Sequence, residues 1–184
     1  MSITCLFVQA LAAQDWPQFR GPNASGIANE KDLPVEFGPE KNLVWKTPLP
    51  AGHSSPVLTK DRLFVTAYEP NKLYVMALNR ADGKILWRRE VPKERNQELH
   101  KSNSPASPSV ATDGKNVYAF FTDFGLICFD VAGKEQWRLP LGPFNNPFGL
   151  GASPILAEDK VLLICDVESD SFFLAVDKNT GKVK

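Results

Sequence analysis

The sequence has few of the residues that most often build reactive or metal-binding centres. Its 184 residues include two histidines and three cysteines, with no His-x-x-x-His spacing and no paired Cys-x-x-Cys. Zinc sites are built from such spacings, so a zinc centre has no support. The Gly-x-Ser-x-Gly turn that presents a nucleophilic serine is also missing. The sequence therefore assigns no catalytic residue and no metal ligand.

The chain also lacks an excess of either charge and any long apolar run. Lys and Arg total 21, as do Asp and Glu, so the formal net charge is zero. A nucleic-acid-binding domain normally carries a basic excess, which argues against that function. No apolar run reaches the ~18–20 residues of a membrane span. The 15 prolines and 12 glycines fall between short apolar runs, as expected of an all-β protein with many turns.

The first fourteen residues differ from the rest. An apolar stretch that ends in Ala-Leu-Ala-Ala-Gln resembles the core and cleavage site of a secretory signal, although no basic residue precedes Arg20. We therefore interpret 1–14 as a signal peptide cleaved near Ala13 or Gln14, with an ordinary buried strand as the alternative. The first interpretation predicts export to the periplasm or the extracellular space.

The cysteines give little functional information. Cys5 would leave with the signal peptide, whereas Cys128 and Cys165 stand inside apolar runs. Small buried thiols are the favoured interpretation, and a disulfide between neighbouring repeats is the alternative.

One sequence phrase occurs three times at intervals of roughly 50 residues. Each copy has Ser-Pro, a β-rich run and then Gly-Lys, and the Ser-Pro pairs begin at Ser55, Ser107 and Ser153. The Gly-Lys pairs begin at Gly83, Gly133 and Gly181. A period of ~40–50 residues is typical of propellers and other repeat arrays, in which one unit needs stacked neighbours to bury its apolar face.

Each copy divides into short β-rich runs separated by turn residues. In the first copy the runs cover 56–59, 62–68, 73–79 and 84–91, and the later copies follow the same order. This spacing is typical of antiparallel arrays. The sequence thus predicts an all-β fold, a β-propeller of four-stranded antiparallel blades, with about three blades at 53–91, 105–141 and 152–184.

The blades follow an N-terminal segment, 15–52. Within it, 43–49 resembles an outer strand that stands alone, and such a strand often completes the last blade of a closed propeller. The third blade would reach its Trp one residue after Lys184. We therefore expect a fragment of a larger ring, truncated in its last strand. The alternative is an obligate assembly of part-rings, since an open edge strand invites pairing with another chain.

One Trp and one Gly recur at the same place in the blades, which favours structural roles. A large aromatic on an outer strand can wedge between neighbouring blades, and a glycine suits a tight turn. These residues are Trp45, Trp87 and Trp137, with Gly83, Gly133 and Gly181.

The repeat Ala-Leu-Asn-x-x-Asp-Gly-Lys-x-x-Trp at 77–87 and its shorter copy at 175–182 resemble the pyrroloquinoline-quinone (PQQ)-type propeller repeat. The segments 15–23 and 53–57 are similar to a bacterial exported branch of that superfamily. The resemblance covers 15–184. It implies a propeller fold and leaves the activity open, because fold does not fix function.

The resemblance implies two kinds of relative. Quinoprotein dehydrogenases hold PQQ and Ca²⁺ with an adjacent-cysteine disulfide, a catalytic Asp and Glu/Asn ligands. Non-catalytic members include the propeller lipoprotein of the outer-membrane barrel-assembly machinery. The chain has no Cys-Cys pair and no segment that aligns with the quinoprotein ligands, so it resembles the scaffold type more closely.

Candidate contact residues lie in the long connections between blades. His53 and His100 each precede the first strand of a blade, where a ligand or base role competes with that of a hydrogen-bonded loop histidine. The Gly/Pro-framed loop 142–151 either offers a contact surface or packs against the ring. Its aromatic and amide side chains are Phe144, Asn145, Asn146 and Phe148.

Carboxylates gather at the turns between second and third strands. Asp166, Glu168 and Asp170 offer hard oxygen ligands for a Ca²⁺ site, but they lack the glycine of a calcium loop. The alternative is a solvated turn. Neither a metal nor PQQ is assigned to any residue on this basis.

Two functions remain. The first is a non-catalytic, exported scaffold that binds a protein or peptide partner in the cell envelope. The second is a PQQ-dependent oxidoreductase whose catalytic residues lie in blades outside this sequence. The first is favoured, with the remaining blades of the full-length protein as further partners.

Overall fold

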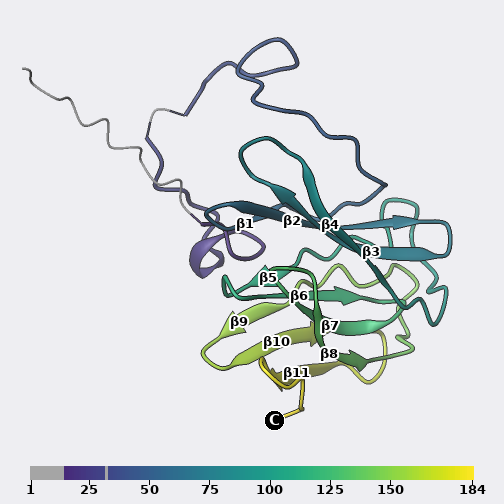
Figure 1. Cartoon of the computed structure of the whole chain (residues 1–184). Coiled ribbons are helices and arrows are strands. Elements are labelled where there is room, and N and C mark those ends of the chain that lie inside the picture. Colours follow the sequence, from purple (N-terminus) through teal and green to yellow (C-terminus); the bar gives the residue numbers. More distant parts are fainter. Residues whose placement is uncertain (1–14, 32) are drawn as a thin grey trace, which may run out of the picture.

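The computed structural model describes residues 15–31 and 33–184, so the predicted signal peptide lies outside the described residues. Figure 1 shows three small twisted sheets stacked side by side. Within the described residues the one helix is η1 (Pro22–Ala24), a short 3₁₀ turn. The all-β prediction is confirmed, and the three sheets are the three predicted blades.

Blade 1 is a four-stranded antiparallel sheet in the order β1-β2-β3-β4. Its strands are β1 (Val57–Leu58), β2 (Arg62–Glu69), β3 (Lys72–Asn79) and β4 (Ile85–Val91). The six central residues of β3 are all buried, whichever way their side chains point. A strand that is covered on both faces is expected where a blade is packed between neighbours.

Blade 2 repeats this order with β5 (Ala111–Thr112), β6 (Asn116–Phe121), β7 (Gly125–Asp130) and β8 (Glu135–Pro140). The turn after β7 is fixed by the Asp130 carboxylate, which accepts hydrogen bonds from the backbone N–H groups of Ala132 and Lys134, both at 2.9 Å. Asn79 and Asp177 organise the same turn in the other blades. The repeated Asn/Asp is therefore a turn-forming residue.

Blade 3 contains β9 (Ile155–Ala157), β10 (Lys160–Cys165) and β11 (Phe172–Asp177). Val183 forms an isolated antiparallel bridge with Val176. In blade 2 the equivalent pair is Phe129 with Glu135, the first residue of β8. The bridge thus stands where a fourth strand begins.

The strand register corrects one alignment made from the sequence. Val57 pairs with Phe64, Ala111 with Tyr118, and Ile155 with Leu162, so the residues two positions earlier are equivalent in the three blades. These are Ser55, Ser109 and Ser153. Ser107, which the Ser-Pro repeat placed at this position, instead donates a side-chain hydrogen bond to Asn103 within the preceding loop.

The equivalent serines connect successive blades. The backbone N–H of Ser55 donates to Ser109 Oγ at 2.8 Å, and the N–H of Ser109 donates to Ser153 Oγ at 2.9 Å. Innermost strands expose N–H groups that have no further strand to pair with, and here a hydroxyl of the next blade accepts them. The Ser-Pro spacing could not show this, because the two serines of Ser107-Pro108-Ser109 compete for the same alignment.

The hydrophobic core lies between the blades. One buried cluster joins blade 1 to blade 2, and a second joins blade 2 to blade 3. At each joint an outer-strand tryptophan lies against the glycine turn of the next blade. Trp87 Nε1 donates to the carbonyl of Val131 at 2.9 Å, and a Cβ atom on Gly133 would stand 2.8 Å from the Trp87 ring. A side chain at this turn would therefore push the blades apart.

The same contact occurs before and after that joint. Trp137 Nε1 donates to the carbonyl of Lys178, and Trp45 Nε1 donates to that of Arg80, both at 2.9 Å. Trp45 thus contacts blade 1 as Trp87 contacts blade 2. Unlike Trp87 and Trp137, Trp45 is only half-buried.

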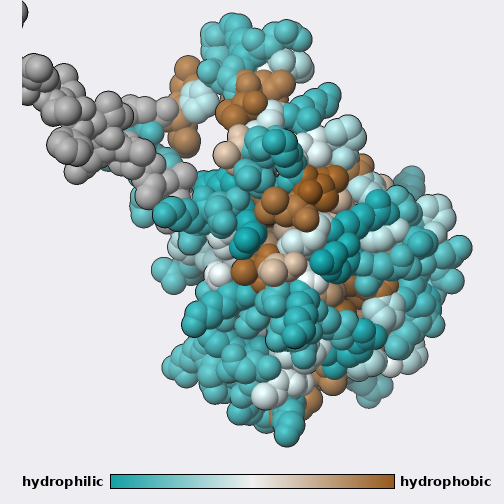
Figure 2. All heavy atoms as spheres, viewed as in Figure 1, coloured by the Kyte–Doolittle hydropathy of each residue, from teal (hydrophilic) through white to brown (hydrophobic). Residues whose placement is uncertain are grey.

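The blades give the molecule two different ends. The turn face carries the turns that follow β1, β3, β5, β7, β9 and β11, which hydrogen-bond to one another within each blade. The loop face carries the opposite turns, 70–71, 122–124 and 166–171, with the long connections 92–105 and 140–152. Figure 2 shows a largely hydrophilic surface with apolar patches near the top and centre. The N-terminal segment contributes exposed apolar side chains: Leu33, Val35, Phe37, Leu43, Val44 and Leu49.

Candidate functional site: the loop face

The two long connections of the loop face form one continuous layer, named here the loop surface (92–105 and 140–152). Gln97 Nε2 donates to the carbonyl of Phe144 at 2.8 Å, and Asn103 Nδ2 donates to that of Phe148 at 2.8 Å. The backbone N–H of His100 also reaches the carbonyl of Phe148, at 3.4 Å. Connections from different blade boundaries are thereby held together by side-chain amides.

A buried carboxylate anchors this layer to blade 2. Asp123 is 1% exposed, and its Oδ1 accepts a hydrogen bond from the backbone N–H of Gln97 at 2.8 Å. The ammonium of Lys93 lies 3.5 Å from Asp123 Oδ2. A buried charge is tolerated when it is paired and hydrogen-bonded, as it is here. Asp123 stands in the turn between β6 and β7, and no local sequence pattern indicates this anchoring role.

The two phenylalanines of the loop 142–151 point in opposite directions. Phe144 is 5% exposed and packs edge-on against Phe120, with ring centroids 5.8 Å apart. Its ring is therefore part of the core between blades 2 and 3, and the structure does not offer it as a contact residue. Phe148 is 60% exposed and lies 6.2 Å from the ring of His100.

The amides and histidines complete the surface. Asn145 Nδ2 donates to Ser169 Oγ at 3.2 Å, and Asn146 Nδ2 donates to the carbonyl of Asp166 at 3.3 Å, which ties the loop to blade 3. His53 is exposed, and its backbone N–H donates to the carbonyl of Ala106 at 3.0 Å. The structure thus brings His100 and Phe148 together and holds the two asparagines against the neighbouring turn.

The turn carboxylates do not form a metal site in the described part of the chain. No group of three or more His, Cys, Asp or Glu side chains converges there. The Asp166 carboxylate accepts a hydrogen bond from Ser171 Oγ, while Glu168 contacts the loop through its backbone N–H, which donates to Asn145 at 3.0 Å. The Ca²⁺ interpretation of Asp166, Glu168 and Asp170 therefore finds no matching geometry.

Both described cysteines are free and buried between blades 2 and 3, so the disulfide alternative is wrong. Burial raises the pKa of the Cys165 thiol to about 11, and burial also raises the pKa of Cys128. Thiols that stay protonated at neutral pH are poor nucleophiles and poor metal ligands. The buried-thiol interpretation matches their surroundings.

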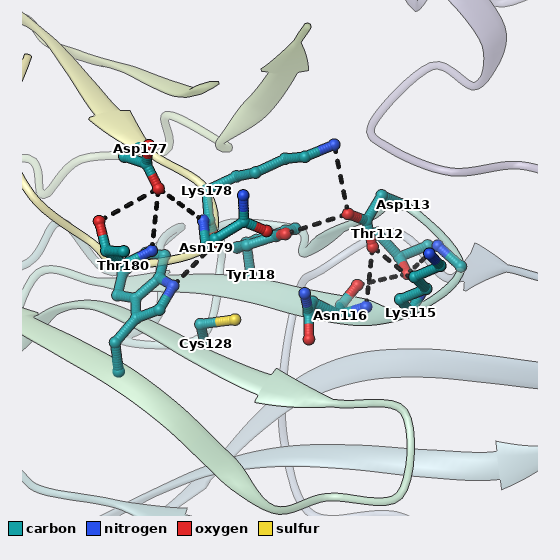
Figure 3. Close-up of polar contacts among 12 residues, drawn as sticks. Thr112, Asp113, Lys115, Asn116, Tyr118, Cys128, Asp177, Lys178, Asn179 and Thr180 are labelled. Atoms are coloured by element: carbon teal, nitrogen blue, oxygen red, sulfur yellow. Dashed lines mark hydrogen bonds and ion pairs between the residues drawn. The ribbon is translucent and has the colours of Figure 1, made fainter. Parts of the chain in front are cut away.

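A polar cluster on the turn face spans the same joint (Figure 3). The Tyr118 hydroxyl donates to Asp113 Oδ2 at 3.2 Å, and the Lys178 ammonium lies 3.5 Å from the same oxygen. Burial alone would raise the pKa of Asp113, but N–H donors from Asn116 and Lys115, together with Lys178, lower it. These contacts join blade 2 to blade 3 and are structural in kind.

The repeated sheets, their tryptophan–glycine joints and the ladder of serines define a β-propeller repeat protein. Within that class, the chain belongs to the PQQ-type repeat family described as outer membrane protein assembly factor BamB, whose pattern matches residues 35–184. Curated proteins give no match to the chain.

Solved structures show the same fold at low identity. Quinohemoprotein alcohol dehydrogenase from Comamonas testosteroni is 19% identical with a TM-score of 0.62, covering 97% of this chain and 28% of its own. A europium-containing methanol dehydrogenase is 20% identical with a TM-score of 0.53, covering 74% and 24%. BamB from Moraxella catarrhalis is 16% identical with a TM-score of 0.51, covering 76% and 37%. The chain thus spans between about a quarter and somewhat over a third of these proteins.

The dehydrogenase neighbours raise the question of whether PQQ fits this chain. Of the two described cysteines, Cys128 lies on β7 and Cys165 on β10, and both are buried in the core. Among the described residues, no group of acidic side chains converges on one point. The residues present do not fit the quinone and its Ca²⁺. The described residues also contain no helix long and apolar enough to span a membrane.

Proposed function

We propose that this chain is part of a non-catalytic PQQ-like propeller scaffold that binds a protein or peptide partner through the loop surface. The observation that carries the proposal is Phe148, whose side chain is 60% exposed while its backbone is held at both polar groups. Its carbonyl accepts hydrogen bonds from the N–H of His100 and from Asn103 Nδ2, and its N–H donates to Asn146 Oδ1. Aromatic side chains held in a pre-ordered surface are favoured interface anchors, because little conformational freedom is lost on binding.

The contact set follows from this geometry. His100 and Phe148 form its aromatic centre. His53, Asn145 and Asn146 are proposed as further polar contacts. Phe144 supports the layer from below and touches the core, so it acts by positioning the loop. The family's description as an outer membrane assembly factor supports an exported protein of the bacterial cell envelope, in agreement with the signal expected at 1–14.

The N-terminal segment fits the same scaffold. The structure assigns no strand to the segment 43–49, which the sequence predicted as an outer strand. We propose that the segment takes the outer-strand place of a blade in the complete ring, since Trp45 meets Gly83 as Trp87 meets Gly133. The other strands of that blade, and further blades, would come from chain outside 15–184.

The scaffold is tested by site-specific photocrosslinking of the full-length protein in its own bacterium. A photoreactive amino acid at position 148 or 145 is expected to give one discrete crosslinked protein. The matched control is position 136, an exposed residue on β8 at the rim of blade 2. Equal crosslinking at 136, or none at 148 with the protein expressed, would contradict the proposal.

The dehydrogenase neighbours motivate the second function, a PQQ-dependent oxidoreductase with its catalytic residues in other blades. Calorimetric titration of the complete protein with PQQ and Ca²⁺ separates the two. The scaffold predicts no heat of binding. Tight binding that is lost on removal of Ca²⁺ would transfer the assignment to the oxidoreductase.

A further inference from the structure

The innermost strand of each of the three blades points a backbone N–H group toward the ring axis from the same position. Leu58, Thr112 and Leu156 follow the paired residues Val57, Ala111 and Ile155, so they occupy one equivalent position at the turn-face end of each inner strand. Their N–H groups point away from the second strand of their own blade. Such edge groups require a partner or water.

Three consecutive residues of the N-terminal segment supply that partner in all three blades. Trp16 and Leu58 exchange two backbone hydrogen bonds of 2.9 Å, the N–H of Thr112 donates to the carbonyl of Pro17 at 2.8 Å, and the N–H of Leu156 donates to Gln18 Oε1 at 3.4 Å. One short peptide therefore crosses from blade 1 to blade 3 over the inner strands. Figure 1 shows this part of the chain beside the end of β1, where β5 and β9 also lie.

The residues that follow fold back on this peptide. Gly21 is buried against the indole of Trp16, and a Cβ atom there would lie 2.5 Å from the ring. Its φ of 69° is one that side-chain-bearing residues rarely adopt. Arg20 Nε donates to the carbonyl of Ala24 at 3.1 Å, and the N–H of Gly26 donates to the carbonyl of Arg20 at 2.8 Å. The segment thus has an ordered shape of its own.

Proline is well suited to the middle of this peptide. Pro17 has no N–H group, and the contact with blade 2 requires only its carbonyl. The flanking Trp16 offers both a donor and an acceptor to blade 1, where both are used. The order Trp-Pro-Gln therefore matches the hydrogen-bonding needs of the three inner strands.

We propose that residues 16–26 form a plug, here called the axial plug, which binds the inner-strand edges and closes the turn-face end of the ring axis. The ligand of this edge is the chain's own Trp-Pro-Gln peptide, which forms a β-bridge with blade 1 and accepts one hydrogen bond from each of blades 2 and 3. With this end closed, a partner reaches the axis from the loop face. That consequence rests on the proposed function, whereas the plug itself does not.

The test is residue-resolved hydrogen exchange on the Gly21→Val variant of the full chain. The new side chain displaces Trp16, so the amides of Leu58, Thr112 and Leu156 are expected to exchange at least ~10-fold faster together, although they lie far apart in the sequence. Amides in β2, β6 and β10 keep their rates. Gly114→Val is the matched control, because Gly114 also has positive φ, 82°, but no atom lies within 4 Å of its Cβ position.

The outcomes separate the alternatives. Faster exchange at Leu58 alone would mean a strand added to blade 1, and unchanged exchange at all three would mean no plug; either overturns the proposal. If Gly21→Val fails to fold, Gln18→Ala is expected to accelerate the amide of Leu156 and leave Leu58 protected. Crosslinking at position 148 of the parent protein tests the scaffold separately, so its absence there would count against the scaffold and not against the plug.

Discussion

Blades 2 and 3 carry apolar side chains at the same positions of the face that points away from blade 1, yet their surroundings differ. In blade 2, Phe120 and Leu126 are fully buried. The equivalent residues in blade 3, Ile164 and Phe173, are 57% and 60% exposed. Blade 2 has blade 3 as its neighbour on this face, whereas blade 3 has none among the residues that the structure describes.

The comparison shows that an apolar sheet face in this fold is buried only where a neighbouring blade packs against it. Each sheet is apolar on both faces, and the joint between two sheets removes those faces from water. Tryptophan, glycine and serine contacts then fix how the two sheets meet. The outward face of blade 3 is apolar and exposed, and such a face favours association with other chains.

Lysine substitutions at the two equivalent positions, 120 and 164, should give the largest difference in the free energy of unfolding. Phe120→Lys puts a charge into a closed joint and removes the contact with Phe144, so we expect a loss of more than ~4 kcal/mol in the free energy of unfolding, or no folding at all. Ile164→Lys should change it by less than ~1 kcal/mol in the 184-residue chain. Urea unfolding of both variants measures the difference.

Self-association gives the second readout of that pair. The 184-residue chain is expected to associate in sedimentation experiments, and Ile164→Lys should reduce this because it places a charge on the open face. Equal destabilisation by the two lysines would mean that the face of blade 3 is already covered. A strictly monomeric parent chain would contradict the comparison in the same way.

The three tryptophans are buried to different degrees, so their truncation to Ala should cost different amounts of stability. Trp87 and Trp137 are 7% and 8% exposed, and truncation of either to Ala should cost about 3–5 kcal/mol. Trp45 makes the same hydrogen bond but is half-buried, so Trp45→Ala should cost about 1–2 kcal/mol. Denaturant unfolding gives the three values, and Leu86→Ala, at an exposed site on β4, is the control. Three equal losses would refute the grading.

Much of this architecture could be predicted from the sequence because its signals are local. Turn residues such as Asn79 and Gly83, and alternating apolar runs, determine strands within a few residues of where they occur. The four-stranded blade and its order follow from three copies of that pattern. The alignment at Ser107 was wrong because the Ser-Pro pair of the second copy lies two residues before the equivalent serine, Ser109. Only the strand register distinguishes the two serines.

The loop surface and the axial plug could be predicted far less well. Phe144 and Phe148 stand in the same Gly/Pro loop, and their sequence positions do not show that one faces Phe120 and the other solvent. Similarly, Trp16, Pro17 and Gln18 find partners in three different blades. Contacts of this kind depend on how sheets stack, which no short pattern encodes.

The two closed joints also differ at the turn face, and this gives the smallest predicted effect. The joint between blades 2 and 3 carries the ion pair of Asp113 and Lys178, 3.5 Å apart. By strand register, the corresponding positions between blades 1 and 2 are Thr59 and Val131, which have no charge. Removing the charge with Asp113→Asn should therefore cost no more than about 1 kcal/mol at pH 7, since the pair is partly exposed.

The sign of the pH dependence follows from the lowered pKa of Asp113. Folding favours the ionised carboxylate, so its contribution is complete above about pH 4 and is lost as the pH falls through the lowered pKa. The difference in unfolding free energy between the parent and Asp113→Asn should shrink over that range. Asparagine can still accept from the N–H groups of Lys115 and Asn116, which isolates the charge. Lys178→Gln should remove most of the same difference, and a difference that persists unchanged at pH 2 would show that the charge is not its source.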